Sequence, residues 1–371
     1  STLDRSSAAS DVYKRQLICI VLMTFKFSAS AASSSYHELN KEVLGSINRG
    51  LEWLKTQQDK DGFFRHHPGI TALAVSAFLK HPENKYKESN HNFIRNAMSG
   101  LVKLQQSNGA IYDINMQPAL PNYNTSISLM ALSSAGNPDY NEVIKKAQNY
   151  IKGLQIQDTE SVFFGGIGYG SRATVNDLSN LNLALQALKE SGFEDQNTWD
   201  NAIKFLEKCQ NSSETNNQAW AGNDGGFIYA PNGESKAGKD NQGSPKSYAS
   251  MTYAGLLSFI YANIDKNDQR VQSALNWIKK NFTVEENYGM GKQGLFYNYH
   301  TMAKALSIYG QDEIIDSKGM SHNWYKELAD KLIEEQTQEG FWVNESSRWM
   351  EQDPVLVTAY AILALEAAYK N

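Results

Sequence analysis

Apolar and polar residues follow one another along this chain in long segments with a helical period. From about residue 46 onward, amphipathic segments with Lys, Glu and Asn on one face precede segments that are apolar almost all round. The first kind is typical of a helix at a protein surface, and the second of a buried helix. The sequence shows no strand-like alternation of useful length. The pattern therefore predicts an all-α protein in which outer and buried helices alternate.

These helix pairs are related by an internal repeat. Each amphipathic helix ends in an apolar residue, followed four positions later by an anchor and then by a turn of glycine and aromatic residues. Glycine permits the positive-φ backbone that lets the chain reverse. The apolar residues and anchors are Leu54/Gln58, Leu101/Gln105, Ile151/Gln155, Leu206/Gln210, Ile278/Phe282 and Leu332/Gln336. The buried helices are expected at Ile70–Leu79, Thr125–Leu132, Leu178–Leu188, Tyr248–Tyr261, Tyr299–Tyr309 and Val355–Ala368.

The last repeat favours a closed ring over an open array. An open array of repeats needs polar capping units at its ends. Here the last buried helix, Val355–Ala368, is as apolar as the middle ones, and ring closure would cover it. We therefore expect an α/α toroid of six helix hairpins, about twelve helices, forming a single domain over residues 32–371. The N-termini of its inner helices should surround one mouth of a central cavity.

The repeat resembles that of a known superfamily. Residues Arg49–Phe64 contain Arg-Gly-x2-Trp-Leu-x3-Gln-x3-Gly-x-Phe, similar to the QW motif of squalene–hopene cyclases, and Leu332–Trp342 is similar to its second half. Gly225-Gly226-Phe227 and Tyr299-His300-Thr301 are similar to prenyltransferase β subunits. The resemblance covers about Ser46–Ala368 and implies the toroid fold. It implies no particular reaction, because one fold hosts many chemistries.

The chemistry of that superfamily is not matched residue by residue. Its class II cyclases need an Asp-x-Asp-Asp acid, and the nearest pattern here is Asp59-Lys-Asp61, in the first turn. Its prenyltransferases bind zinc through Asp, Cys and His, and an ungapped match places Lys246 and Tyr248 at the first two positions and His300 at the third. One ligand of three cannot hold zinc. We therefore expect no metal site and no cofactor.

Three polar residues at the expected starts of inner helices are candidate catalytic groups. Asp177 and Asp353 could act as acid or base at the cavity mouth, or could serve as helix N-caps that accept backbone N–H bonds. Pro354 favours the cap for Asp353, since proline is common at the first helical position. His300 could be a general base with a near-neutral pKa, or a packed histidine near the mouth.

Aromatic residues near the same mouth are candidate ligand contacts. We expect Tyr123, Tyr248, Tyr299 and Trp349 to contact a ligand in the central cavity. Tyrosine is plentiful in the chain, but most of the 19 tyrosines fall in turns. The polar, glycine-rich insertion 229–245 could fold over the mouth as a lid, or could be a surface excursion. His66-His67 has no carboxylate or cysteine at metal-ligand spacing and is interpreted as loop.

The net charge and the N-terminal segment limit the partners and the location that we expect for this protein. The net charge of −5 with scattered Lys and Arg argues against a nucleic-acid surface. Residues 1–31 are interpreted as a non-native extension followed by a signal peptide, with the apolar run 17–25 and an Ala29-x-Ala31 cleavage signal; an uncleaved anchor is the alternative. We expect a secreted or periplasmic bacterial monomer with no stable membrane span in the mature chain. Cys209 would be its only cysteine.

Three functions remain open at this stage. The first is an exported protein that binds a ligand in the central cavity without either catalytic constellation. The second is an enzyme acting on a polysaccharide through Asp177, Asp353 or His300, and the third is a divergent terpenoid cyclase. Two carboxyls about 5–10 Å apart across the cavity would favour glycoside hydrolysis. A dry cavity lined by aromatic residues would favour the terpenoid, and a shallow solvated bowl would favour binding.

Overall fold

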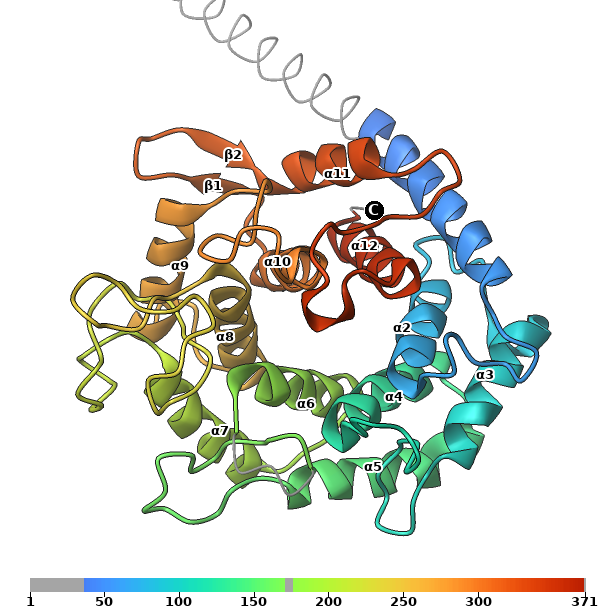
Figure 1. The fold of residues 1–371 in the computed structure, drawn as a ribbon, viewed down its shortest axis with the longest axis horizontal. Coiled ribbons are helices and arrows are strands. Elements are labelled where there is room, and N and C mark those ends of the chain that lie inside the picture. The colour runs from blue at the N-terminus through green and yellow to red at the C-terminus, as the bar shows by residue number, and fades with distance from the viewer. Residues whose placement is uncertain (1–36, 171–175, 370–371) are drawn as a thin grey trace, which may run out of the picture.

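The described chain forms a ring of helices in two concentric layers (Figure 1). The computed structural model describes residues 37–170 and 176–369, and the predicted extension and signal peptide lie outside this part. The inner helices are α2 (Pro68–Leu79), α4 (Pro121–Ala135), α6 (Leu178–Glu190), α8 (Ala249–Tyr261), α10 (Leu295–Tyr309) and α12 (Pro354–Ala368). The outer helices are a first helix (37–56), α3 (Asn92–Lys103), α5 (Asn141–Gly153), α7 (Gln196–Cys209), α9 (Gln269–Asn281) and α11 (Trp324–Glu335).

The two layers follow from the pattern of apolar residues. An inner helix contacts an inner neighbour on each side, so it is buried nearly all round, and in α2 only Leu79 is not fully buried. Outer helices bury one stripe and expose the other face. The ring closes because α12 packs against α2. The predicted α/α toroid is confirmed, and no helix of the described residues is long and apolar enough to cross a membrane.

The anchor glutamines join successive outer helices. Gln58 donates its side-chain amide to the carbonyl of Gly62 in its own turn and to that of Phe93 in α3, both at 2.8 Å. The glutamines of the second, third, fourth and sixth repeats do the same, each to its own turn and to the next outer helix. The repeated motif therefore ties the outer layer together and explains why it specifies the fold.

The turn glycines are required because the turn touches the next outer helix. Gly165 has a φ of +82°, and a Cβ there would lie 1.8 Å from the carbonyl oxygen of Asn201 in α7. Gly109 has a φ of +93°, and its Cβ would lie 2.3 Å from the carbonyl oxygen of Lys146 in α5. No side chain fits either position.

The fifth repeat departs from the others. Its anchor is Phe282, whose ring lies 5.1 Å from that of His322 instead of donating to a backbone carbonyl. His322 belongs to a short antiparallel hairpin, β1 (Glu313–Ile315) and β2 (Ser321–Asn323), which the sequence did not reveal. Three short 3₁₀ turns complete the elements: η1 (Glu88–Asn90), η2 (Pro138–Tyr140) and η3 (Arg348–Met350).

Two of the predicted helix starts are wrong by about one turn. The second inner helix begins at Pro121 rather than Thr125, and the fifth begins at Leu295 rather than Tyr299. In the fifth, Gly294 and the buried Glu351 complete the helix start, and neither is an N-cap that the local sequence would suggest. Tyr299 and His300 consequently lie in the second turn of α10, not at its start.

Candidate functional site

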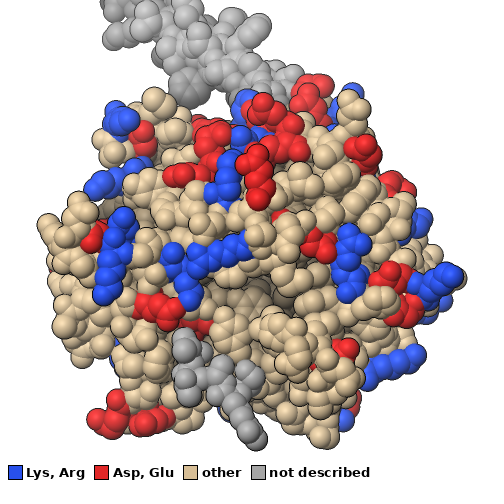
Figure 2. All heavy atoms as spheres, viewed as in Figure 1, with Lys and Arg blue, Asp and Glu red and all other residues tan. Residues whose placement is uncertain are grey.

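A cavity of about 370 Å³ lies where the N-terminal ends of the inner helices meet. The face of the ring that carries this mouth is hollowed at its centre (Figure 2). The wall is mainly apolar and aromatic. Its aromatic residues are Tyr123, Tyr169, Tyr229, Tyr248, Tyr297, Trp349 and Tyr360, and its aliphatic ones include Ile70, Leu73, Ile127, Met251 and Leu356.

One group of polar contacts links the cavity to a buried carboxylate. The Tyr123 hydroxyl donates to the Ser179 hydroxyl at 2.7 Å, and Ser179 donates to Asp177 at 2.6 Å. Because the hydroxyl hydrogen of Tyr123 points to Ser179, its oxygen can accept a hydrogen bond from a ligand. Burial, together with the nearby Asp177 carboxylate, raises the pKa of Tyr123, so the phenol stays neutral.

Two turn tyrosines extend this polar edge. The hydroxyls of Tyr169 and Tyr229 are hydrogen-bonded to each other at 2.8 Å, and the ring of Tyr169 stacks on that of Tyr123 at 5.8 Å. Their backbone carbonyls accept hydrogen bonds from the first residues of α4 and α6. Turn tyrosines therefore form part of the cavity wall, because the turns border the mouth.

Asp177 is a helix cap and is fully buried. Its Oδ1 accepts from the backbone N–H of Asn180 at 3.0 Å, and its Oδ2 accepts from the Asn180 side chain at 2.8 Å. Burial raises the pKa of Asp177, and these hydrogen bonds counter the rise. The cap interpretation is confirmed. Since each oxygen already accepts hydrogen bonds from these groups, Asp177 supports the site through Ser179 and does not line the cavity.

The other two carboxylates near the mouth also cap helices. Glu351 lines the cavity, but it accepts from the backbone N–H groups of Phe296 and Tyr297 at 3.3 and 2.9 Å and so caps α10. Asp353 caps α12 through the Val355 N–H at 2.8 Å and pairs with Arg65 at 3.0 Å. The arrangement offers no carboxylate pair facing each other across the cavity with free oxygens among the described residues.

His67 is a cavity residue that the sequence interpretation placed in a loop. Its Nδ1 accepts from the backbone N–H of Gly69 and Ile70, at 3.1 and 3.3 Å, and so caps α2. An accepting Nδ1 assigns the ring proton to Nε2. Burial lowers the pKa of His67, which favours this neutral form. A histidine placed just before the Pro68 that opens a buried helix was the available signal.

The predicted ligand contacts divide into two groups. Tyr123, Tyr248 and Trp349 line the cavity, and 46% of Trp349 is exposed at its mouth. Tyr299 does not line it: its hydroxyl donates to the carbonyl of Val284 at 2.7 Å, on the side of α10 away from the cavity. Tyr297, two residues earlier, takes the cavity position because residues two apart on a helix face nearly opposite ways.

His300 lies away from the central cavity. Its ring stacks on Tyr360 at 5.6 Å, so the side of Tyr360 that His300 covers is not the cavity wall. It lines a separate space at the opposite mouth of the ring. Burial, followed by the charges of Lys304 and Lys80, lowers the pKa of His300 to about 3. The structure therefore does not bring His300 together with Asp177 or Asp353.

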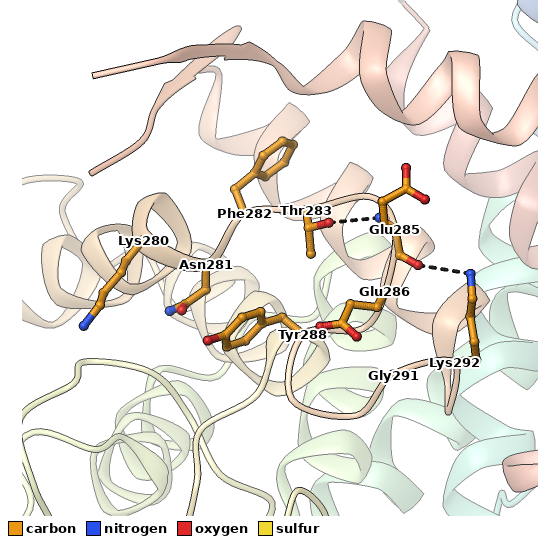
Figure 3. Close-up of a pocket in the computed structure, with 9 residues that line it drawn as sticks. All are labelled: Lys280, Asn281, Phe282, Thr283, Glu285, Glu286, Tyr288, Gly291 and Lys292. Atoms are coloured by element: carbon orange, nitrogen blue, oxygen red, sulfur yellow. Dashed lines mark hydrogen bonds between the residues drawn. The ribbon is translucent and has the colours of Figure 1, made fainter. Parts of the chain in front are cut away.

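Two further features of the surface resemble binding sites. Asp59, Asp61 and His66 place ligand-type atoms within 4.8 Å of one another, which corrects the expectation that no carboxylate lies near this histidine. In the structure His66 Nδ1 contacts Asp61 at 2.8 Å, an exposed arrangement that a hydrogen bond accounts for. A groove of about 490 Å³ follows α9 (Figure 3). Its nine residues come from the single segment 280–292 and carry charges of both signs.

The insertion 229–245 is ordered into turns at the side of the ring (Figure 1). Short bridges join Ala230 to Glu234 and Lys239 to Pro245. Of this insertion, only Tyr229 lines the cavity. The structure thus shows a peripheral excursion rather than a lid lying across the mouth.

Proteins of known structure with the same fold catalyse different reactions. No protein-family model matches the chain, and no characterised protein matches it by sequence. The type II terpene cyclase MstE from Scytonema, in complex with geranylgeranyl dihydroxybenzoate, superposes with a TM-score of 0.54 and 11% identity, covering 90% of this chain and 99% of that one. A protein from Actinoplanes gives 0.54 and 13%, covering 88% and 100%.

A polysaccharide-degrading enzyme is equally similar. The GH76A α-1,6-mannanase from Salegentibacter sp. HEL1_6 superposes with a TM-score of 0.55 and 10% identity, covering 88% of this chain and 98% of that one. At such identities the comparison establishes the fold alone. The chain is therefore an α/α-toroid protein of the kind that the QW-like repeat predicted, with a tyrosine-lined central cavity.

Proposed function

We propose that this protein binds a mainly apolar ligand with one polar group, of terpenoid or similar lipid character, in its central cavity. The cavity wall carries the proposal: seven aromatic side chains and several aliphatic ones surround a space of about 370 Å³. Such a wall excludes water and favours apolar surface. The polar edge formed by Tyr123, Tyr169 and Tyr229 would receive the polar group of the ligand.

The hydrogen bonds made by the carboxylates near the cavity argue against cyclisation by protonation of an alkene. Protonating an alkene needs a carboxylic acid that is free to deliver its proton. Asp177, Glu351 and Asp353 each accept backbone N–H bonds at helix starts, and the sequence lacks Asp-x-Asp-Asp. We therefore favour binding over cyclisation.

Hydrolysis of a polysaccharide is less well supported. A variant of the Salegentibacter mannanase with two consecutive aspartates replaced by asparagine is described as inactive. This chain contains no two consecutive aspartates. Its cavity also offers an apolar wall, whereas sugar binding relies on many polar contacts.

The first test is direct binding of one probe of each class. The tryptophan fluorescence of the full chain, to which Trp349 at the cavity mouth contributes as one of seven tryptophans, would be followed while farnesol or α-1,6-mannotriose is added. We expect saturable binding of farnesol and none of mannotriose. Ile127→Trp, which fills the cavity from α4, should abolish farnesol binding, whereas Ile308→Trp, at an exposed position on α10, should leave it unchanged.

Mannotriose binding without farnesol binding would overturn the proposal, as would farnesol binding that Ile127→Trp does not reduce. Release of shortened or cyclised products would show an enzyme instead of a binding protein. Export through a signal peptide remains part of the proposal, since it rests on residues 1–31.

A further inference from the structure

A second cavity, of about 230 Å³, lies at the opposite mouth of the ring, where the inner helices end. We call it the second mouth; it is lined by Lys80, His300, Lys304, Ser307, Ile308, Leu363, Glu366 and Ala367. The stacked rings of His300 and Tyr360 lie between it and the central cavity, because Tyr360 lines one space and His300 the other. The ring thus encloses two spaces along its axis.

Three charged side chains meet across the second mouth. The two oxygens of Glu190, at the end of α6, accept separately from Lys80 at 2.9 Å and from Lys304. Lys80 follows α2 and Lys304 lies on α10, and these three helices alternate around the ring with α4, α8 and α12 between them. The contacts therefore reach across the ring rather than between adjacent helices.

This group carries more positive than negative charge. Burial alone would raise the pKa of Glu190, but Lys304 and Lys80 outweigh burial and lower it to about 2, so the carboxylate is ionised. Burial lowers the pKa of Lys304 to about 8, which leaves most of it protonated at neutral pH. Two ammonium groups then face one carboxylate, and each retains N–H donors after its bond to Glu190.

Two further polar side chains line this space. His300 is 7% exposed and lies against Tyr360. Both carboxyl oxygens of Glu366 are buried and have no hydrogen-bond partner among the described residues. Burial raises the pKa of Glu366, which favours the neutral carboxyl, a form that can donate a hydrogen bond. Buried polar groups in folded proteins are normally satisfied, so unpaired ones facing a cavity indicate a missing partner.

The donors of the second mouth exceed its acceptors. The two ammonium groups, the Glu366 carboxyl and the neutral His300 can all donate, while Glu190 is the acceptor already in use. A ligand that complements this set carries negative charge and several acceptor oxygens. The volume restricts it to a small group.

We propose that the second mouth binds a small oxyanion, a carboxylate or a phosphate, through the ammonium groups of Lys80 and Lys304. Helix C-termini also attract cations, so a group of charges that merely stabilises the ring is the competing explanation. A purely stabilising group of charges would need no ligand. A measurement of anion binding therefore distinguishes the oxyanion site from the stabilising role.

The test is calorimetric titration of the full chain with sodium phosphate and, separately, with sodium acetate, at constant ionic strength set with sodium chloride. We expect saturable binding of at least one anion. Lys80→Met and Lys304→Met should each weaken it by about tenfold or more, since each removes an ammonium donor. Lys326→Met is the matched control, because Lys326 is an exposed residue of α11. It should leave binding unchanged.

Binding of phosphate but not acetate would indicate a phosphate ligand, and the reverse a carboxylate. If Lys304→Met fails to fold, Lys80→Met decides, because 30% of the Lys80 side chain is exposed at the rim. The proposal is overturned if neither anion binds in the millimolar range, or if all three variants bind as the wild type does. Reduced stability of the variants without any anion binding would show the purely structural role.

Discussion

The side-chain amide of Gln336 donates a hydrogen bond to the carbonyl of Ser46 at 3.0 Å, although 290 residues separate them along the chain. The same amide donates to Gly340 at 2.8 Å. The last repeat thereby holds the first helix by the same bonds that join every other pair of outer helices except the fifth and sixth.

Replacing this glutamine should weaken ring closure. We expect Gln336→Ala to lower the free energy of unfolding in urea by about 1–3 kcal/mol, because the carbonyls of Ser46 and Gly340 lose their donor. Gln242→Ala, at an exposed position in the insertion, should stay within about 0.5 kcal/mol of the wild type. Equal effects of the two substitutions would show that the bond does not secure closure.

A pair of glycines can separate backbone strain from steric contact. Gly192 has a φ of +70° with nothing near its would-be Cβ, so Gly192→Ala should cost about 1–2 kcal/mol from the left-handed conformation alone. Gly165→Ala adds a clash with the Asn201 carbonyl and should cost more than about 4 kcal/mol, or prevent folding. Urea unfolding of both variants measures the difference. Similar losses would mean that α7 can move away from the turn.

The hydroxyls of Tyr123 and Tyr299 should have different roles, the first in ligand binding and the second in stability. Tyr123→Phe removes an acceptor from the cavity, and we expect it to weaken farnesol binding about fivefold, the equivalent of roughly 1 kcal/mol. Tyr299→Phe leaves the carbonyl of Val284 without its donor, so it should lower stability by about 1 kcal/mol and leave affinity unchanged. Fluorescence titration and urea unfolding of both variants test this. A binding defect in Tyr299→Phe alone would reverse the assignment of these side chains.

Acid should break the ion pairs of Glu190 with Lys80 and Lys304. The pKa of Glu190 is lowered to about 2 in the folded state, below the value near 4.5 of an unperturbed carboxyl. A lowered pKa gives stability that is present above pH 4.5 and lost as the pH falls toward 2. The stability difference between wild type and Glu190→Gln should therefore be large at pH 6 and shrink between pH 4.5 and 2. Urea unfolding across this range measures it, and a constant difference would contradict the shift.

The fold could be predicted because its determinants are local and repeated. Gln58 and Gly62 lie four residues apart, and this spacing recurs in the second and sixth units. The third and fourth units also pair their glutamine with a glycine of the turn, at a longer spacing. Because an anchor and a glycine-containing turn follow the amphipathic helix in every unit, the repeat is still recognisable although the fifth unit has Phe282 in place of the glutamine. The apolar character of the last helix then indicated closure, and α12 does bury its surface against α2 and α10.

The site was harder to predict because it depends on helix phase and on contacts between repeats. Placing the start of α10 at Tyr299 put His300 at the cavity mouth, whereas the helix begins at Leu295 and turns Tyr297 inward. The residue that completes this start, Glu351, comes from a loop more than fifty residues later. No spacing in the sequence links Glu351 to α10, so neither its role nor the inward position of Tyr297 could be inferred.

The capping of inner helices from other repeats has a consequence for how the protein unfolds. Asn287 accepts from the Ser250 N–H at the start of α8, and Glu351 accepts from the Tyr297 N–H at the start of α10, so these two helix starts are complete only when the next repeat is folded. In an open solenoid, end units can fray one by one. A ring whose units complete one another has no such free end. Loss of one unit exposes the helix start of its neighbour, and the molecule should therefore lose its structure as one cooperative body rather than unit by unit.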